Sequence, residues 1–221
     1  MSTVPYVLEF SAISLGDIPV VGGKNASLGE MFNALTPLGV KTLDGFATTV
    51  EAWKRYLEEN DLRAKLEDIL RGVDISSVSD LTKAGSAARA LILGTPLPDD
   101  LVIAINKAYG ELAERIGREP AVAVRSSATA EDLPGASFAG QQETYLNVAP
   151  GAELLDMVHR CFASLYTDRA ISYRAGHGFR HEQVAISVGV QPMVRSDLGS
   201  AGVVFTLDPE TGFRNVVSIS G

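Results

Sequence analysis

An arginine followed by small hydroxyl residues is the first feature of this sequence that could do chemistry. Arg125 follows the apolar residues 121–124, and Ser126, Ser127 and Thr129 come after it. A guanidinium held at the end of a buried strand can present a planar fork of N–H donors to phosphate oxygens. Neighbouring hydroxyls and backbone N–H groups can bind the same anion. The pattern therefore indicates phosphate binding.

A structural role is the alternative for this segment. Arg125 would then pair with Glu131 or Asp132, and the small residues would form a surface loop. Exposed ion pairs of that kind contribute little to stability. Composition alone leaves both interpretations open.

Lys24 is a second candidate for phosphate binding. It follows two glycines and precedes a helix that the apolar spacing predicts from about residue 25 to residue 35. A helix start attracts anions through its unpaired N–H groups and its positive dipole end. The segment is not a Walker A loop, because the chain has Ile18 where that motif needs glycine, and Asn25 where it needs Ser or Thr. Spacing alone also allows an ordinary exposed lysine at a helix start.

Length, composition and charge restrict the class of protein. The chain has 221 residues with 46% hydrophobic content, which suffices for one large domain or two smaller lobes with a sizeable core. Its net charge of −8 and the lack of any Lys/Arg run argue against a nucleic-acid partner. A polyphosphate ligand would therefore depend on a few local cations and a divalent metal.

Cysteine content and hydropathy indicate the compartment. Cys161 is the only cysteine, so the chain forms no internal disulfide, and cytoplasmic localisation is expected. Its apolar helical neighbours predict a buried thiol. The sequence offers neither a signal-peptide pattern nor a long apolar run, so we expect no membrane partner.

The remaining elements follow from apolar periodicity and from Gly and Pro punctuation. Strands are predicted at about 6–10, 45–49, 121–124, 143–148, 184–190, 201–206 and 215–219, and helices at about 25–35, 50–59, 62–70, 78–93, 98–116, 152–165 and 168–175. Gly117 is placed to end the helix before it. The β-type ending predicts a mostly antiparallel sheet that begins near residue 190.

Five segments carry a resemblance to a known family. They are VAVRSSATAEDLPGASFAGQQETYLNV (122–148), VGGKNASLGEM (21–31), GFATT (45–49), FASLYTDRAISYR (162–174) and QPMVRSDLGSAGVVFTLDPETG (191–212). In this collinear order they resemble the nucleotide-binding domain of the phosphoenolpyruvate synthase and pyruvate phosphate dikinase family, most closely its synthase members. The resemblance covers nearly the whole chain.

The resemblance implies an α+β, ATP-grasp-like nucleotide-binding domain in which the nucleotide lies between two lobes. Residues 1–190 are expected to form a helix-rich first lobe. Residues 191–221 are expected to form the hinge and the beginning of a β-rich second lobe, which would be truncated at Gly221.

The resemblance also implies phosphate-binding residues. The family residues that match Lys24 and Arg125 contact ATP phosphates. Gly140, Gln141 and Gln142 match a flap that closes over the nucleotide and excludes water. For Gln142, a role as a solvated turn residue is equally open.

Adenine contacts are implied at the hinge. Gln191, Met193 and Val194 match residues that hold the base through a side-chain amide, backbone groups and an apolar wall. Without the resemblance, Met193 would be assigned to the core. Pro192 has no N–H to donate there.

The activity implied by the resemblance needs more than this chain. Family enzymes of the synthase type convert ATP, pyruvate and water to phosphoenolpyruvate, AMP and phosphate through a phosphohistidine on a downstream domain. His159, His177 and His181 lack the glycine-rich surroundings of that residue. No catalytic residue is therefore expected here, and pyruvate would bind only through downstream domains. His177 and His181 have helical spacing, but a third metal ligand is missing.

Magnesium is the second implied cofactor, and its ligands are expected beyond Gly221. Asp208 and Glu210 are the candidates within the chain, although their DPETG segment is also typical of a turn, which we favour. Three alternatives stay open: a pyruvate phosphate dikinase, an antibiotic phosphotransferase and a non-catalytic nucleotide-binding module. Homo-oligomerisation is left open as well.

Overall fold

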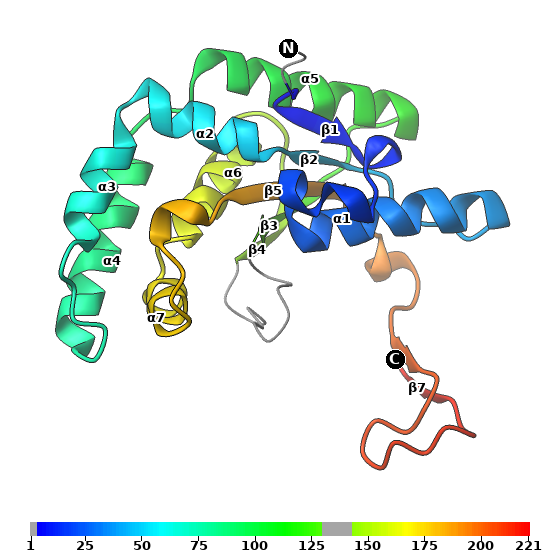
Figure 1. Ribbon diagram of the computed structural model, residues 1–221. Helices are drawn as coiled ribbons and strands as arrows, with labels where there is room; N and C mark the ends of the chain where they lie inside the picture. The colour runs from blue at the N-terminus through cyan, green and yellow to red at the C-terminus, as the bar shows by residue number, and fades with distance from the viewer. Residues whose placement is uncertain (1–3, 130–142) are drawn as a thin grey trace.

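The computed structural model of the chain describes residues 4–129 and 143–221. Within them, a five-stranded antiparallel sheet forms the centre, with strand order β1-β2-β5-β3-β4 (Figure 1). Its strands are β1 (Val7–Glu9), β2 (Phe46–Thr48), β3 (Val122–Ala128), β4 (Thr144–Val148) and β5 (Ile186–Pro192). A separate pair, β6 (Val203–Phe205) and β7 (Ser218–Ser220), lies near the C-terminus. The described part of the chain is thus a mixed α+β protein.

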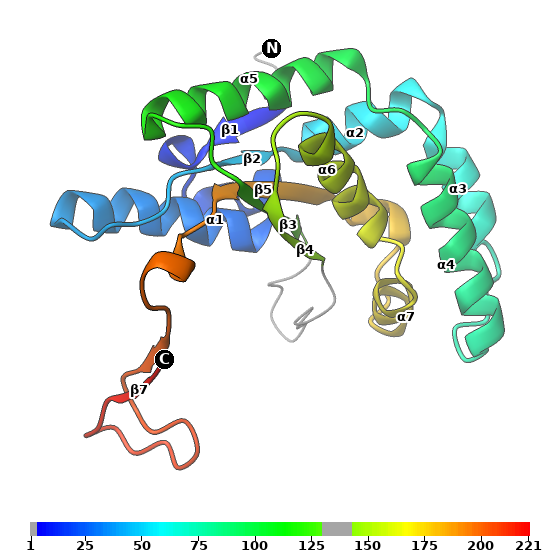
Figure 2. The same cartoon turned by 180° about the vertical axis from the view of Figure 1, so that it is seen from behind.

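Helices pack on both faces of the sheet, as Figures 1 and 2 show from opposite sides. They are α1 (Ile18–Leu35), α2 (Val50–Glu59), α3 (Leu62–Leu70), α4 (Val78–Leu93), α5 (Asp99–Ile116), α6 (Ala152–Ser164) and α7 (Asp168–Gly176). We call the face that packs against α1 the α1 face and the opposite one the core face. Among the described residues, no helix combines the length and hydropathy needed to cross a membrane.

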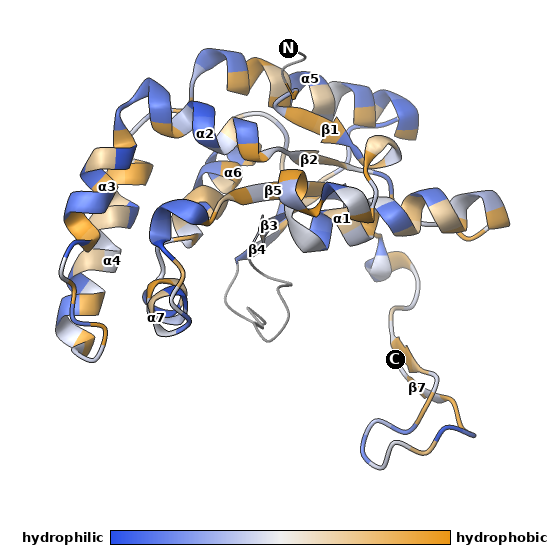
Figure 3. Ribbon diagram, in the orientation of Figure 1, coloured by the Kyte–Doolittle hydropathy of each residue, from blue (hydrophilic) through white to orange (hydrophobic). Residues whose placement is uncertain are grey.

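Two apolar clusters correspond to the two faces. On the core face, Val124 and Val190 join a large cluster that includes Phe162 of α6 and Leu112 of α5. On the α1 face, a smaller cluster joins Ala47 of β2 to residues of α1 and of the short helix η1 (Phe10–Ala12). In Figure 3 the ribbons of α3 and α5 alternate between hydrophilic and hydrophobic bands, as expected for helices with one buried face. The α1 face therefore has far less apolar cover than the core face.

Most of the predicted elements occur where the pattern placed them. The helices α2, α3 and α4 have the predicted bounds, and α5 begins one residue later than predicted and ends at Gly117, whose φ is 75°. Cys161 is buried in α6, as expected, and burial raises the pKa of its thiol. Such a thiol packs as a small apolar residue.

The predicted extent of β3 was wrong. The strand does not end at residue 124 but continues through Arg125, Ser126 and Ser127 to Ala128, each paired with β5. The two serines are buried between neighbouring strands, with exposed fractions of 1% and 0%. Short hydroxyl side chains can be buried there because nearby backbone groups and side chains satisfy them, and apolar periodicity does not detect this.

The predicted C-terminal sheet was also wrong in one respect. The predicted strand 184–190 corresponds to β5, which is not part of a second sheet but the central strand of the first one, between β2 and β3. Every residue of β5 is buried. The second pair of strands begins only at Val203, and its apolar side chains are exposed, with 59% for Val204 and 75% for Ile219.

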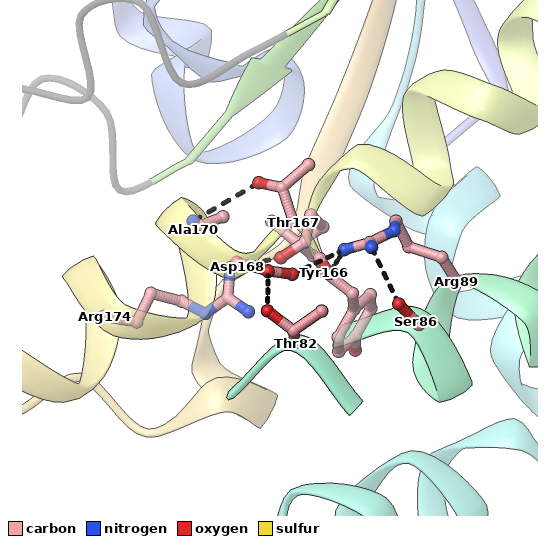
Figure 4. A network of polar contacts seen from close by, with 9 residues as sticks. Thr82, Ser86, Arg89, Tyr166, Thr167, Asp168, Ala170 and Arg174 are labelled. Carbon is pink, nitrogen blue, oxygen red and sulfur yellow. Dashed lines mark hydrogen bonds and ion pairs between the residues drawn. The ribbon is translucent and has the colours of Figure 1, made fainter. Parts of the chain in front are cut away.

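A polar network joins α4 to the start of α7 (Figure 4). Asp168 accepts hydrogen bonds from Thr82 Oγ1 at 2.8 Å and from Arg89 Nη1 at 3.1 Å. The same Arg89 nitrogen donates to the carbonyl of Tyr166 at 2.7 Å. A Cβ at Gly85 would lie 2.5 Å from Asp168 Oδ1, so the close approach of the two helices depends on that glycine. The network fixes the segment that carries Tyr166.

Candidate functional site

Arg125 is the exposed residue in the middle of an otherwise buried strand. It is paired with Gly189 of β5 on one side and Thr144 of β4 on the other. Residues that oppose each other in a sheet share a face, and successive residues alternate between faces. Because Val124 belongs to the core face, Arg125 lies on the α1 face. Of the two faces of the sheet, the α1 face packs against the smaller apolar cluster.

A break in α1 allows the helix to approach β3 closely. Gly22 has φ 73° and ψ 163°, which is not helical, and a Cβ there would lie only 2.3 Å from Ser127 Oγ. The regular helix starts after this break, which confirms the helix predicted from about residue 25. Lys24 is therefore at a helix start and is exposed.

Asn25 fastens this helix start to the sheet. Its Nδ2 donates to Ser187 Oγ at 2.8 Å, and its backbone N–H approaches Ser127 Oγ at 3.5 Å. A Cβ on Gly189 would lie 2.2 Å from Asn25 Oδ1, so the residue opposite Arg125 must be glycine for α1 to pack here. Through Asn25, the fold brings Lys24 and Arg125 to the same side of the sheet.

The surroundings of Arg125 suit an anion. Within residues 4–129 and 143–221, its guanidinium forms no ion pair, and its structural alternatives, Glu131 and Asp132, lie outside the described residues. Lys24 does take part in an interaction with another residue. Two exposed cations on one face, beside the positive end of a helix, provide the charge that phosphate oxygens need.

The hydroxyl groups next to Arg125 form hydrogen bonds within the protein. Ser126 Oγ donates to the Glu143 carbonyl at 3.3 Å, and Thr129 Oγ1 donates to the Ala185 carbonyl at 3.3 Å. Ser127 lies against α1 and is fully buried. The sequence-based idea that these hydroxyls join the anion site is therefore not supported. They position Arg125 by holding β3 against its neighbours.

Of the predicted adenine contacts, Gln191 shares the face of Arg125. It opposes Ala123, two residues before Arg125, which puts the two positions at the diagonal spacing of about 7–8 Å. Its side chain is 5% exposed. Met193 and Val194 follow the end of β5. Met193 is half-buried, and Val194 is exposed.

Two backbone groups of this segment already form hydrogen bonds within the protein. The Met193 N–H donates to the Ala121 carbonyl at 2.8 Å, and the Val194 carbonyl accepts from the Ser196 N–H at 2.9 Å. A base at this position would thus rely on side chains more than on these two backbone groups. Gly140, Gln141 and Gln142, the predicted flap, lie outside the described residues.

The three histidines each have a ring nitrogen bonded within the protein. His159 Nε2 lies 3.0 Å from the Tyr56 hydroxyl and 2.8 Å from the Ile92 carbonyl, and burial lowers its pKa. His177 Nδ1 lies 2.9 Å from the Tyr173 carbonyl. His181 Nδ1 accepts a hydrogen bond from Arg174 Nε at 3.0 Å. These contacts give all three residues structural roles.

Asp208 forms a turn, as favoured from the sequence. Its carboxylate accepts hydrogen bonds from Thr211 Oγ1 at 2.5 Å and from the Glu210 N–H at 3.1 Å, which lower its pKa. In the described part of the chain, no three His, Cys, Asp or Glu residues gather as metal ligands do. The residues present do not fit a magnesium site by themselves.

Sequence reasoning missed the role of Asn25 and the cluster of Arg174 with His181. From the sequence, Asn25 was considered only as a departure from the Walker A motif. A polar residue within an apolar helix face could have indicated a buried hydrogen bond. Arg174 is 0% exposed, which a charged residue near the end of a helix does not reveal by its spacing.

Comparison with known proteins gives a consistent picture. Residues 18–221 match a family model described as "Pyruvate phosphate dikinase, AMP/ATP-binding domain". The chain is 52% identical over 219 residues to a phosphoenolpyruvate synthase of Synechocystis sp., an alignment that covers 97% of this chain and 27% of that protein. It is 53% identical over 215 residues to the phosphoenolpyruvate synthase of Aquifex aeolicus, covering 97% and 25%.

A further relative is the phosphoenolpyruvate synthase of Escherichia coli (strain K12), with 48% identity over 216 residues that cover 98% of this chain and 27% of the relative. The chain thus spans about a quarter of the length of these curated relatives.

Proposed function

Because the chain belongs to the pyruvate phosphate dikinase AMP/ATP-binding domain family, we propose that it is the N-terminal ATP-binding portion of a phosphoenolpyruvate synthase. Relatives named phosphoenolpyruvate synthase support this choice, with about half of the residues identical. The complete enzyme would convert ATP, pyruvate and water to phosphoenolpyruvate, AMP and phosphate. A phosphohistidine outside these 221 residues would carry the phosphoryl group.

The observation that carries this proposal is the placement of Arg125 and Lys24 on the α1 face. Gly22, Gly189 and Asn25 allow the helix start and the arginine to come together. In the proposed site, the guanidinium and the ammonium neutralise phosphate charge and orient the transferred group, since phosphoryl transfer depends mainly on positioning and electrostatics.

The other nucleotide contacts extend the same face. Gln191 would offer its side-chain amide to adenine, and Met193 with Val194 would pack against the base. Gly140, Gln141 and Gln142 would close over the phosphates. The domain would be ATP-grasp-like, with residues 1–190 as the first lobe and 191–221 as the hinge and the beginning of the second. Magnesium would be held by ligands outside the described residues.

Calorimetric titration with Mg–ATP tests the site. Arg125→Ala and Lys24→Ala are each expected to weaken binding about tenfold or more, since a charge-assisted hydrogen bond contributes about 1.5–3 kcal/mol. Arg160→Ala is the matched control, because this exposed arginine of α6 pairs, among the described residues, with Asp156 alone. Unchanged affinity in the first two variants would contradict the proposed phosphate contacts.

A pyruvate phosphate dikinase is the second candidate, since the family description names that enzyme. An antibiotic phosphotransferase or a non-catalytic module shares the same proposed site, and the acceptor domain decides among these activities. Under the proposal, the 221-residue chain forms no AMP in a pyruvate-dependent manner. Pyruvate-dependent AMP formation by this chain alone would show that the chemistry does not need a further domain.

A further inference from the structure

A cavity of about 470 Å³ lies between α2, α3 and the segment after α7, and the proposed nucleotide contacts that the structure describes are not among its lining residues. Its apolar wall includes Trp53, Leu66 and Tyr166. Its charged lining consists of three arginines and two glutamates, namely Arg63, Arg71, Arg180, Glu67 and Glu182. The side chains of Arg63 and Arg180 are 45% and 72% exposed; Arg63 Nη2 lies 3.7 Å from Glu58, and Arg180 is paired with Glu182. The volume falls within the range of about 300–1,000 Å³ that small-molecule sites occupy. An apolar wall beside a lining in which arginines outnumber carboxylates suits an amphipathic anion.

A buried arginine lies directly behind this wall. Arg174 of α7 is 0% exposed, and its guanidinium lies 5.6 Å from the ring centre of Tyr166. Its Nη1 donates to the Leu165 carbonyl at 2.6 Å, and its Nε donates to His181 Nδ1 at 3.0 Å. The third nitrogen, Nη2, is buried and has no hydrogen-bond partner in the part of the chain that the structure describes. Tyr166 and His181, which contact Arg174, both line the cavity.

The charge of Arg174 is not balanced by a nearby carboxylate. Burial lowers its pKa to about 10, so the guanidinium stays protonated at neutral pH. No ion pair joins it to an acidic residue of the described chain. A buried cation is normally paired with an anion, because the low dielectric of the interior makes an isolated charge costly. The same low dielectric strengthens its attraction for an anion that enters the cavity.

His181 adds a hydrogen-bond donor to the wall. Burial and the Arg174 charge lower the pKa of its imidazole to about 4, so the ring is neutral at pH 7. Since Nδ1 accepts from Arg174, the ring proton resides on Nε2. Neutral His181 therefore brings a donor, and no negative charge, to the cavity.

We propose that this cavity binds a small organic anion, distinct from the nucleotide bound on the α1 face. Its apolar or aromatic body packs against Trp53 and Leu66, and its anionic group lies toward Arg63, Arg180 and the buried Arg174. The site does not depend on the proposed ATP contacts, since Lys24 and Arg125 are not part of its wall.

Fluorescence of Trp53 provides a direct measurement, because it is the only tryptophan in the chain and lines the cavity. Phenyl phosphate serves as the probe, with phenol and inorganic phosphate as its two halves. A saturable change in Trp53 emission is expected with phenyl phosphate, with an affinity at least about tenfold higher than for either half. Equal affinity for inorganic phosphate and phenyl phosphate would overturn the role of the apolar wall.

Exposed arginines allow a test that does not disturb the core. The double variant Arg63→Gln and Arg180→Gln is expected to weaken phenyl phosphate binding at least about tenfold, while Arg160→Gln and Arg125→Gln leave it unchanged within about twofold. Thermal denaturation of each variant shows that it is folded. Two results would overturn the proposal: no saturable change at millimolar probe, or weaker binding in Arg125→Gln but not in the double variant.

Discussion

At the scale of single residues, two glycines set the distance between α1 and the sheet. Gly22 has a backbone conformation that other residues rarely adopt, and Gly189 leaves room for Asn25. Neither contributes a side chain to the proposed site. Both determine where Lys24 and Arg125 lie, so their substitution should affect folding and binding together.

Gly22→Ala is expected to destabilise the protein by about 2–4 kcal/mol, since it adds backbone strain to a close contact with Ser127. Urea denaturation measures the loss. Gly110→Ala in α5 is the matched control, because a Cβ there meets no atom within 4 Å. That control should be neutral or stabilising by up to about 1 kcal/mol. Equal effects of the two substitutions would contradict the proposed packing constraint.

His181 should make stability depend on pH. Its pKa is about 4 in the folded protein, below the ordinary value of 6.5, so the unfolded chain takes up a proton first as the pH falls. Its contribution is fully retained above about pH 6.5 and is lost progressively as the pH decreases toward 4. His181→Gln keeps an acceptor for Arg174 and removes the titration.

The urea midpoint of the unaltered protein should therefore fall more steeply between pH 7 and pH 5 than that of His181→Gln, by the linkage between proton binding and unfolding. Parallel pH profiles for the two proteins would show that His181 is not held neutral by its surroundings.

At the scale of elements, the junction of α4 with α7 is held by a polar network. Asp168 joins Thr82 and Arg89, and each of the ion-pair partners is about one third exposed. A double-mutant cycle with Asp168→Ala and Arg89→Ala should give a coupling energy of about 0.5–1 kcal/mol. Additive effects of the two substitutions would mean that the ion pair contributes nothing and that the other bonds of Asp168 hold the junction.

The accuracy with which each element is predicted from the sequence depends on whether local patterns or long-range contacts stabilise it. The approximate bounds predicted for α2, α3 and α4 agree with the structure, because an amphipathic pattern with clear breaks determines the ends of these helices. β3 was predicted too short, because the pattern counts Arg125, Ser126 and Ser127 as polar, whereas hydrogen bonds and the pairing with β5 keep them in the strand. The position of β5 between β2 and β3 depends on long-range pairing, which local periodicity does not contain.

The same distinction between local motifs and long-range contacts applies to the candidate site and to the cavity. Lys24 and Arg125 were chosen from the sequence, and the structure places them on one face. The cavity behind α2 and α3 was missed, because Trp53, Arg63 and Arg174 come from separate segments that share no motif.

At the scale of the whole molecule, the strands differ in how well they are protected from solvent. β5 is buried between two strands, whereas β6 and β7 pair only with each other within the described chain, and their apolar side chains are exposed. An isolated two-stranded sheet is marginally stable. Amide hydrogen exchange should therefore be at least about a hundredfold faster in β6 and β7 than in β5. Comparable protection would indicate that another surface, such as a second copy of the chain, covers the pair.

The strand order also has a consequence for synthesis on the ribosome. β1 pairs with β2, and β3 pairs with β4, but β5 joins the two halves and comes last of the five in the chain. A nascent polypeptide that has not yet emerged as far as Pro192 holds two incomplete half-sheets with open edges. Such intermediates are prone to association, so the growing chain would benefit from a chaperone until its central strand arrives.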